Sequence, residues 1–248
     1  MQMKIMPKSD LEKSLPLLEA NLLFQDFKKF LKTHFGKDVS FLEHDGIQFD
    51  DEDLNDKIEL HFLNDSKNFV TLSFGVQQND ASPFIKYQFV SEENGQIVIK
   101  RGEYKQKTNE FEAHVLEVVD GDLEEGWSII DQRIKSGLLE DLKKDEAVVN
   151  ESIKAQGIFD FCLAGGYQYC GKGCGDCSGC SGGGSIKNKV DGCCYVHDYC
   201  YKNNSTNRCS ACDWDLVNCV QNDINYKTGP IAADSITFFF SSKCGYVF

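Results

Sequence analysis

The sequence of 248 residues predicts two modules: an α+β domain with an antiparallel sheet over residues 1–150, and a small, mainly helical, disulfide-rich domain over residues 151–248. Three observations predict this division. All 12 cysteines lie after residue 161. The net charge of −13 lies entirely in residues 1–161, which carry 19 Lys+Arg against 32 Asp+Glu. Alternating apolar residues fill much of the first part, whereas the second part has helical spacing.

The first module is expected to begin with a helix that ends near Gly36. Alternation then predicts strands near residues 58–62, 70–76 and 85–89, and Asn94-Gly95 predicts a hairpin turn before the return strand QIVIK. One more strand near 111–115 gives a sheet of four or five strands. Helical spacing returns from Trp127 into a charged connector that reaches about residue 156. The stripe of the first helix consists of Ala20, Leu23, Phe24, Phe27 and Leu31.

The acidity of the first module excludes nucleic acid as an expected partner, because phosphate binding depends on Lys and Arg. Nothing in this module has the pattern of a reaction centre. Three roles remain open for it: a propeptide, an inhibitory cover, or a module for delivery or partner binding. Its negative charge would oppose approach to anionic lipid surfaces, which favours a latent form with intramolecular inhibition by residues 1–150.

Cysteine usage predicts a secreted or extracellular protein. Twelve cysteines within residues 162–248 is the density of a small secreted scaffold held by disulfides. The start, MQMKIMPKSDLEKSL, has no apolar segment typical of a signal peptide, and no apolar run approaches the roughly 18 residues of a membrane helix. Unconventional export, a missing leader, or thiols that hold metal in a reducing cell would each reconcile these observations.

The segment VDGCCYVHDYCYKN, residues 190–203, predicts a helix that begins around Asp191. Cys193, His197 and Tyr201 fall at i, i+4 and i+8 and share one face, with Asp198 on a neighbouring stripe. Adjacent cysteines on a helix point about 100° apart, so the two must bind different partners. A helix fixed on two sides holds its histidine and aspartate in set directions, as a preorganised site needs.

Two further segments flank this helix. Upstream, YCGKGCG (169–175) has glycines that let backbone carbonyls converge, and calcium accepts carbonyls together with a carboxylate such as that of Asp198. Downstream, CSACDWDLVNCV (209–220) predicts a second helix with Asp213 among apolar residues on its inner face.

Together these three motifs resemble the secreted, calcium-dependent phospholipases A2. The family signature C-C-x-x-H-D-x-C is present as CCYVHDYC, its calcium loop as YCGKG, and its second-helix pattern as CDWDLVNC. The resemblance covers about residues 160–226 and does not extend to residues 1–150. It implies a phospholipase A2-like catalytic domain over residues 151–248 with two antiparallel helices.

The resemblance also implies an activity: calcium-dependent hydrolysis of the sn-2 ester of glycerophospholipids by a water activated by His and Asp, acting peripherally at a membrane or micelle surface. His197 would be the general base, Asp213 its hydrogen-bonding partner, and Tyr201 a support for an aspartate. Calcium would polarise the ester carbonyl. Its ligands would be the carboxylate of Asp198 and the backbone carbonyls of three loop residues, Tyr169, Gly171 and Gly173.

The disulfides implied by the resemblance are Cys170–Cys194, Cys193–Cys219 and Cys200–Cys212. The pairing of the other cysteines stays open, and these are Cys162, Cys174, Cys177, Cys180, Cys209 and Cys244.

The sequence departs from the family pattern at three places. Cys174 stands where many members have glycine, which bears on the geometry of the calcium loop. Only KNNSTNR joins the two helices, so the β-wing of animal members has no counterpart. The final stretch SITFFFSSKCGYVF has no family equivalent, and its phenylalanines 238–240 are expected to pack against the core or the acidic module rather than touch lipid.

Two alternatives to the enzyme remain. Cysteines 170, 174, 177 and 180, with 209 and 212, have spacings found in zinc and iron–sulfur sites, so a metal-binding protein is one rival. That hypothesis leaves His197, Asp198 and Asp213 unexplained. The other rival is a catalytically inactive toxin or binding protein with the same fold.

Overall fold

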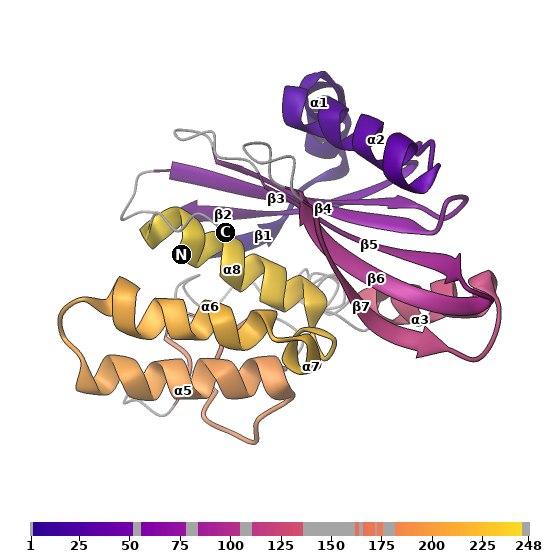
Figure 1. The fold of residues 1–248 in the computed structure, drawn as a ribbon. Coiled ribbons are helices and arrows are strands. Elements are labelled where there is room, and N and C mark those ends of the chain that lie inside the picture. The colour runs from indigo at the N-terminus through magenta and orange to yellow at the C-terminus, as the bar shows by residue number, and fades with distance from the viewer. Residues whose placement is uncertain are drawn as a thin grey trace, which may run out of the picture. The chain divides into compact units, whose positions relative to one another are not determined.

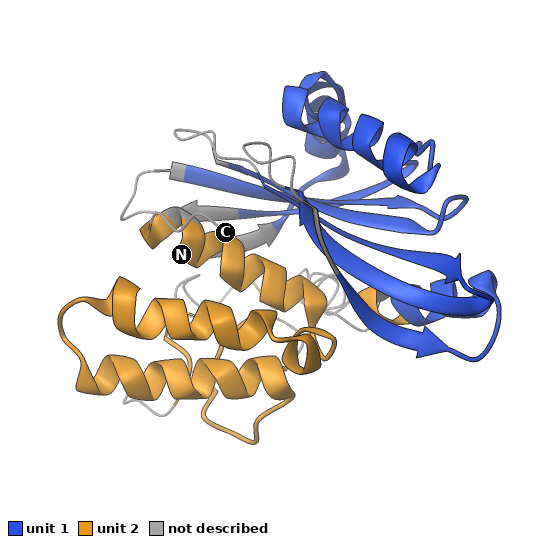
Figure 2. Cartoon of the chain, in the orientation of Figure 1, with its two compact units in different colours: residues 1–131 blue, residues 132–248 orange. Residues whose placement is uncertain are grey.

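The computed structural model describes residues 2–51, 56–77, 84–104, 111–135, 162–163, 166–171, 173–175 and 182–244. The chain divides into two compact units, residues 1–131 and 132–248 (Figure 2). The predicted module boundary at residue 150 and the expected connector after residue 135 lie outside the described residues.

Unit 1 is built on a seven-stranded antiparallel sheet whose strands follow one another in chain order (Figure 1). The expected sheet of four or five strands is therefore too small, because the first two strands were missed. The strands are β1 (Gln2–Ile5), β2 (Glu43–Asp51), β3 (Asp56–Asp65), β4 (Val70–Gln77), β5 (Phe84–Glu93), β6 (Gln96–Tyr104) and β7 (Phe111–Val119). The predicted hairpin turn joins β5 to β6, with Asn94 and Gly95 at φ 54° and 76°.

Helices α1 (Lys8–Ala20) and α2 (Leu22–Phe35) belong to one face of the sheet, and α3 (Leu123–Lys135) to the other. Asn21 caps α2 by accepting from the N–H groups of the next turn, and Gly36 ends it in the left-handed conformation, as expected. Phe35 of α2 packs against Phe89 with the two rings tilted, whereas α3 passes so close to Val90 that a side chain at Gly126 would meet it. Neighbouring residues on a strand point to opposite faces, so both faces carry a helix.

The regular secondary structure that the described part of unit 2 contains is mainly helical. It contains α5 (Lys189–Asn203), the short π-helix η1 (Cys209–Asp213), α6 (Trp214–Gln221), α7 (Asp223–Tyr226) and α8 (Pro230–Cys244). One disulfide joins the start of α5 to the end of α6, Cys193–Cys219, and another joins the end of α5 to η1, Cys200–Cys212. The two helices are therefore antiparallel, and they lie side by side in Figure 1.

All ten described cysteines are in disulfides, a density compatible with an extracellular protein. Within the part of the chain that the structure describes, no helix combines the length and apolar character needed to cross a bilayer.

Candidate functional site

The centre of the candidate site is a histidine–aspartate pair between α5 and η1. His197 Nε2 lies 2.7 Å from Asp213 Oδ1, and the hydroxyl of Tyr201 donates to the same oxygen at 2.6 Å. Since a carboxylate oxygen accepts, Nε2 carries the proton of this hydrogen bond, and the neutral form of the imidazole has its lone pair on Nδ1. The Asp213 side chain is fully buried, whereas that of His197 retains 11% exposure. The pair is thus fixed from inside and reachable from outside.

Local backbone geometry places both members of the pair. Asn188 caps α5 by accepting from the N–H of Asp191, so the helix begins two residues before the expected start. The second segment was predicted as one helix over 209–220, but its first five residues form the π-helix η1. A π-turn adds a residue to the turn and shifts the side chains that follow it, a feature that often occurs at functional sites. Here it ends at Asp213 itself.

Asp198, the predicted calcium ligand, has a buried oxygen without a partner. Its Oδ2 makes no hydrogen bond to any described residue, and its Oδ1 lies 3.9 Å from His197 Nδ1. Burial raises the pKa of Asp198 to about 7, with a further upward contribution from Asp191 and an opposing one from Lys202. A buried carboxylate oxygen that lacks a donor is what a calcium ligand looks like without its cation. This residue fits the cation that the resemblance implies.

The loop before α5 approaches Asp198 closely. Gly175 has φ +99°, and a Cβ added there would lie 2.7 Å from Asp198 Oδ2 and 3.2 Å from the Tyr169 ring. Only glycine allows both the backbone conformation and this approach. Gly171 and Gly173 also have positive φ, 135° and 77°, and the Gly171 carbonyl accepts from the N–H of Cys174 at 3.3 Å. The three residues whose carbonyls are the expected calcium ligands therefore lie in a loop whose conformation depends on glycine, and the end of this loop approaches Asp198.

Asp191 is a buried residue of the site that the sequence analysis used only to mark a helix start. Its carboxylate accepts from the backbone N–H groups of Gln168, Tyr169 and Lys187, at 3.0, 2.9 and 2.9 Å. It is fully buried. The Asp191 side chain, on the first turn of α5, therefore fixes the backbone where the loop begins. The sequence did not indicate this role, because it does not show that Asp191 is buried.

The disulfides connect these parts. The structure forms Cys170–Cys194, Cys193–Cys219 and Cys200–Cys212, the three pairs that the resemblance implied. Two further pairs join cysteines whose partners the sequence left open: Cys162–Cys174 and Cys209–Cys244. Cys177 and Cys180 lie outside the described residues.

The last turn of α8 forms a side of the site that the sequence analysis missed. The ring of Phe240 packs edge-on against His197, with centroids 5.2 Å apart, so this ring packs inside unit 2 and also lines the candidate site, a role that was not expected. Phe238 is buried, as expected. Lys243 Nζ lies 4.0 Å from Asp213 Oδ2 and donates to the Tyr201 hydroxyl at 3.4 Å.

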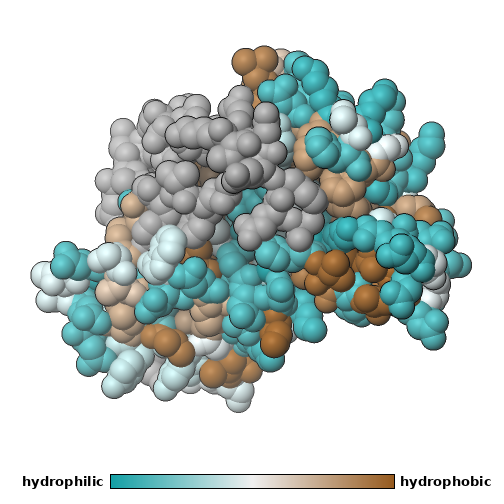
Figure 3. Space-filling view, in the orientation of Figure 1, coloured by the Kyte–Doolittle hydropathy of each residue, from teal (hydrophilic) through white to brown (hydrophobic). Residues whose placement is uncertain are grey.

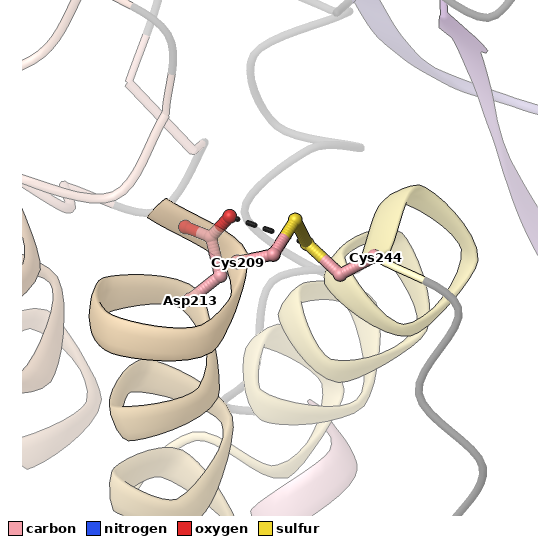
Figure 4. A group of neighbouring side chains, drawn as sticks. All are labelled: Cys209, Asp213 and Cys244. Carbon is pink, nitrogen blue, oxygen red and sulfur yellow. Dashed lines mark hydrogen bonds between the residues drawn. A yellow bond between two sulfur atoms is a disulfide. The ribbon is translucent and has the colours of Figure 1, made fainter. Parts of the chain in front are cut away.

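Cys209, Asp213 and Cys244 each bring a potential metal-ligand atom within 4.8 Å of the others (Figure 4). The two sulfurs are bonded to each other, however, and a metal needs thiolates. The same bond means that Cys244 Sγ, 3.3 Å from Asp213 Oδ2, has no hydrogen to donate, so this is a contact between sulfur and oxygen. With the disulfide formed, Cys209 and Cys244 pack against Asp213 and border the His–Asp site.

Comparison with protein-family models, with curated proteins and with solved structures finds no match for this chain.

Proposed function

We propose that the protein is a calcium-dependent phospholipase A2 that hydrolyses the sn-2 ester of glycerophospholipids and releases a fatty acid and a lysophospholipid. One observation carries the proposal: His197 is hydrogen-bonded through Nε2 to a buried aspartate, while its Nδ1 lies beside Asp198, whose Oδ2 has no hydrogen-bond partner among the described residues. A base and a cation ligand are thus adjacent in space, as a water-activating hydrolase requires.

The chain's own residues have defined tasks in this reaction. Nδ1 of His197 removes a proton from the water that attacks the ester carbonyl carbon, and later gives it to the departing glycerol oxygen. Asp213 keeps the imidazole in the tautomer with its proton on Nε2 and stabilises the imidazolium that forms. Tyr201 donates to the same oxygen of Asp213, which restrains the orientation of the carboxylate.

Asp198 and the carbonyls of Tyr169, Gly171 and Gly173 would hold the calcium ion, with the carboxylate ionised when the cation is present. When bound, calcium polarises the ester carbonyl and stabilises negative charge on its oxygen.

Exposed apolar side chains on α5 support association with a lipid surface. Tyr195, Val196 and Tyr199 are 42%, 62% and 66% exposed, and Figure 3 shows separate apolar patches among hydrophilic residues on the face that it draws. Aromatic side chains with a polar tip suit the boundary between lipid and water.

The test is release of fatty acid from mixed-chain phosphatidylcholine, measured with calcium and with a chelator. We expect the sn-2 chain to be released only with calcium, and the variant His197→Gln to lose this activity. Equal rates with calcium and with chelator, or a His197→Gln variant as active as the parent, would contradict the mechanism. Calcium binding without hydrolysis would favour the inactive binding protein.

The metal-binding alternative has its own test. A thiolate site requires free thiols, whereas Cys170, Cys174, Cys209 and Cys212 are all in disulfides. Counting thiols with and without reductant and chelator separates the two hypotheses, since a disulfide protein shows thiols only after reduction.

A further inference from the structure

The last turn of α8 places three side chains against the His–Asp pair. Phe240, Lys243 and Cys244 fall at i, i+3 and i+4, so they share one face of the helix. Phe240 contacts the ring of His197, and the other two residues face Asp213. This turn comes from the C-terminal stretch that has no equivalent in the resembled family.

The positive charge of Lys243 lies beside the buried carboxylate of Asp213. Its Oδ1 accepts from both His197 and Tyr201, whereas its Oδ2 faces the disulfide sulfur of Cys244 and the ammonium of Lys243. Of these two neighbours of Oδ2, only the ammonium carries hydrogens and a positive charge. A fully buried carboxylate is costly unless both oxygens have compensating neighbours, and the ammonium is such a neighbour for Oδ2.

Lys243 also acts on Tyr201. Its Nζ donates to the phenol oxygen, which in turn donates to Asp213 Oδ1. The ammonium of Lys243 therefore lies near Oδ2 of Asp213 and is linked to Oδ1 through the hydroxyl of Tyr201. A second cation, the guanidinium of Arg208, lies over the Tyr201 ring with Cζ 4.4 Å from the centroid.

The backbone around Lys243 is held in place by one disulfide and one hydrogen bond. The Cys209–Cys244 disulfide ties the adjacent residue to η1, and the Gln221 side chain of α6 donates to Thr237 Oγ1 at 2.6 Å near the middle of α8. The helix therefore cannot move its last turn away from Asp213 without breaking these links, although the lysine side chain itself is 35% exposed.

We propose that Lys243 is a positioning residue: its ammonium holds the Asp213 carboxylate, and through it the imidazole of His197, in the orientation that general-base catalysis requires. The catalytic part of this inference rests on the proposed function. The structural part, control of the His197–Asp213 hydrogen bond, does not depend on it.

The experiment compares Lys243→Met and Lys243→Arg with the parent protein and with Lys189→Met. Lys189 is an exposed lysine eight residues before His197 on α5, about 12 Å away along the helix, so its variant removes the same charge at a distance. Hydrolysis is measured on a short-chain phosphatidylcholine below its micelle concentration, which removes effects on lipid-surface binding. The proton on His197 Nε2 is followed by NMR without substrate.

For Lys243→Met we expect kcat to fall about tenfold with KM changed less than about twofold, since the lost interaction acts on orientation of the base rather than on substrate binding. The downfield Nε2–H resonance should shift or broaden. Lys243→Arg should restore most of both, and Lys189→Met should match the parent.

A Lys243→Met protein with parental kcat and an unchanged Nε2–H resonance would overturn the proposal, as would an equal loss in Lys189→Met. If the parent hydrolyses no phospholipid, the proposed function fails, and the NMR comparison still decides whether Lys243 controls the His197–Asp213 bond.

Discussion

His197 on α5 donates from Nε2 to Oδ1 of Asp213 on η1 across 2.7 Å, although the two residues are 16 positions apart. The link depends on the two disulfides that run along the antiparallel pair, Cys193–Cys219 and Cys200–Cys212. Small protein units with limited cores commonly use disulfides to hold such geometry. The same two helical segments are therefore joined both by the disulfides and by the His197–Asp213 hydrogen bond.

The first prediction concerns the carboxylate of that pair. We expect Asp213→Asn to lower kcat by roughly a thousandfold or more with little change in KM, because an amide can donate to the imidazole and so favour the wrong tautomer. The measurement is fatty-acid release under calcium saturation. The control is Asp215→Asn, an exposed carboxylate two residues away on α6. A loss of the same size in both variants would mean that the effect is not specific to the pair.

The second prediction links calcium to protons at Asp198. Its folded-state pKa of about 7 lies above the usual 3.8, so the protonated form stabilises the fold. In chelator that contribution is complete below about pH 4 and is lost as the pH rises through about 7, and Asp198→Asn should flatten this decline. Calcium requires the ionised carboxylate, so its affinity should rise with pH up to about 7, with a proton released on binding.

Calorimetric titration of calcium in buffers of different ionisation enthalpy measures this proton release. Asp223→Asn, which alters an exposed carboxylate at the start of α7, serves as the control and should bind calcium as the parent does. Calcium binding by the parent without proton release near pH 6 would contradict the assignment of Asp198 as a ligand.

The third prediction concerns Asp191, which holds three backbone N–H groups. Asp191→Asn replaces one accepting oxygen by a donor amide, so at least one of these backbone N–H groups loses its partner. We expect the free energy of unfolding to fall by about 2 kcal/mol, the range for buried hydrogen bonds to charged groups. Calcium affinity should weaken as well, because Tyr169 lies at the entry to the loop. Urea unfolding and calcium titration provide the two readouts, and unchanged stability would contradict the role of this carboxylate.

The fourth prediction separates two disulfides that begin at adjacent cysteines. Cys170–Cys194 and Cys193–Cys219 span 24 and 26 residues, so replacing either pair by serines should cost a similar ~3.5 kcal/mol of unfolding free energy. Only the first ties the proposed calcium loop to α5, so only its loss should also weaken calcium binding, by about tenfold, through a less ordered loop. Equal calcium affinities in the two double variants would show that the loop does not need this tether.

The sequence predicted those parts of unit 1 whose signals are local. Asn94-Gly95 requires its turn, and Gly36 ends its helix because it adopts a left-handed conformation. The strands β1 and β2 were missed for a physical reason. β1 has four residues and β2 is polar, with a glycine at position 46. That glycine is needed because a side chain there would meet Met6 and Leu11, a contact that only the folded structure reveals.

The candidate site shows the same limit. Helical spacing placed His197 and Tyr201 on one face, whereas the pairing of His197 with Asp213 was implied only by the resemblance. The structure brings the three side chains together. Lys243 and Phe240 reach the site from a helix tied by Cys209–Cys244. Six unassigned cysteines allow 15 pairings, so no spacing rule could have selected that one.

The last prediction concerns latency. Residues 1–161 carry all of the net charge of −13, and such a segment opposes approach to anionic lipid. If this segment keeps the enzyme latent, cleavage between about residues 140 and 165 should raise the rate on vesicles that contain anionic lipid. The gain should shrink with added salt, which screens the charge.

A protease site inserted within residues 140–160 gives defined cleavage, and the uncut protein with protease inhibitor is the control. On a monomeric, zwitterionic short-chain substrate the charge has no surface to oppose, so a rate gain there would indicate steric cover of the site instead. An unchanged rate on both substrates would refute latency.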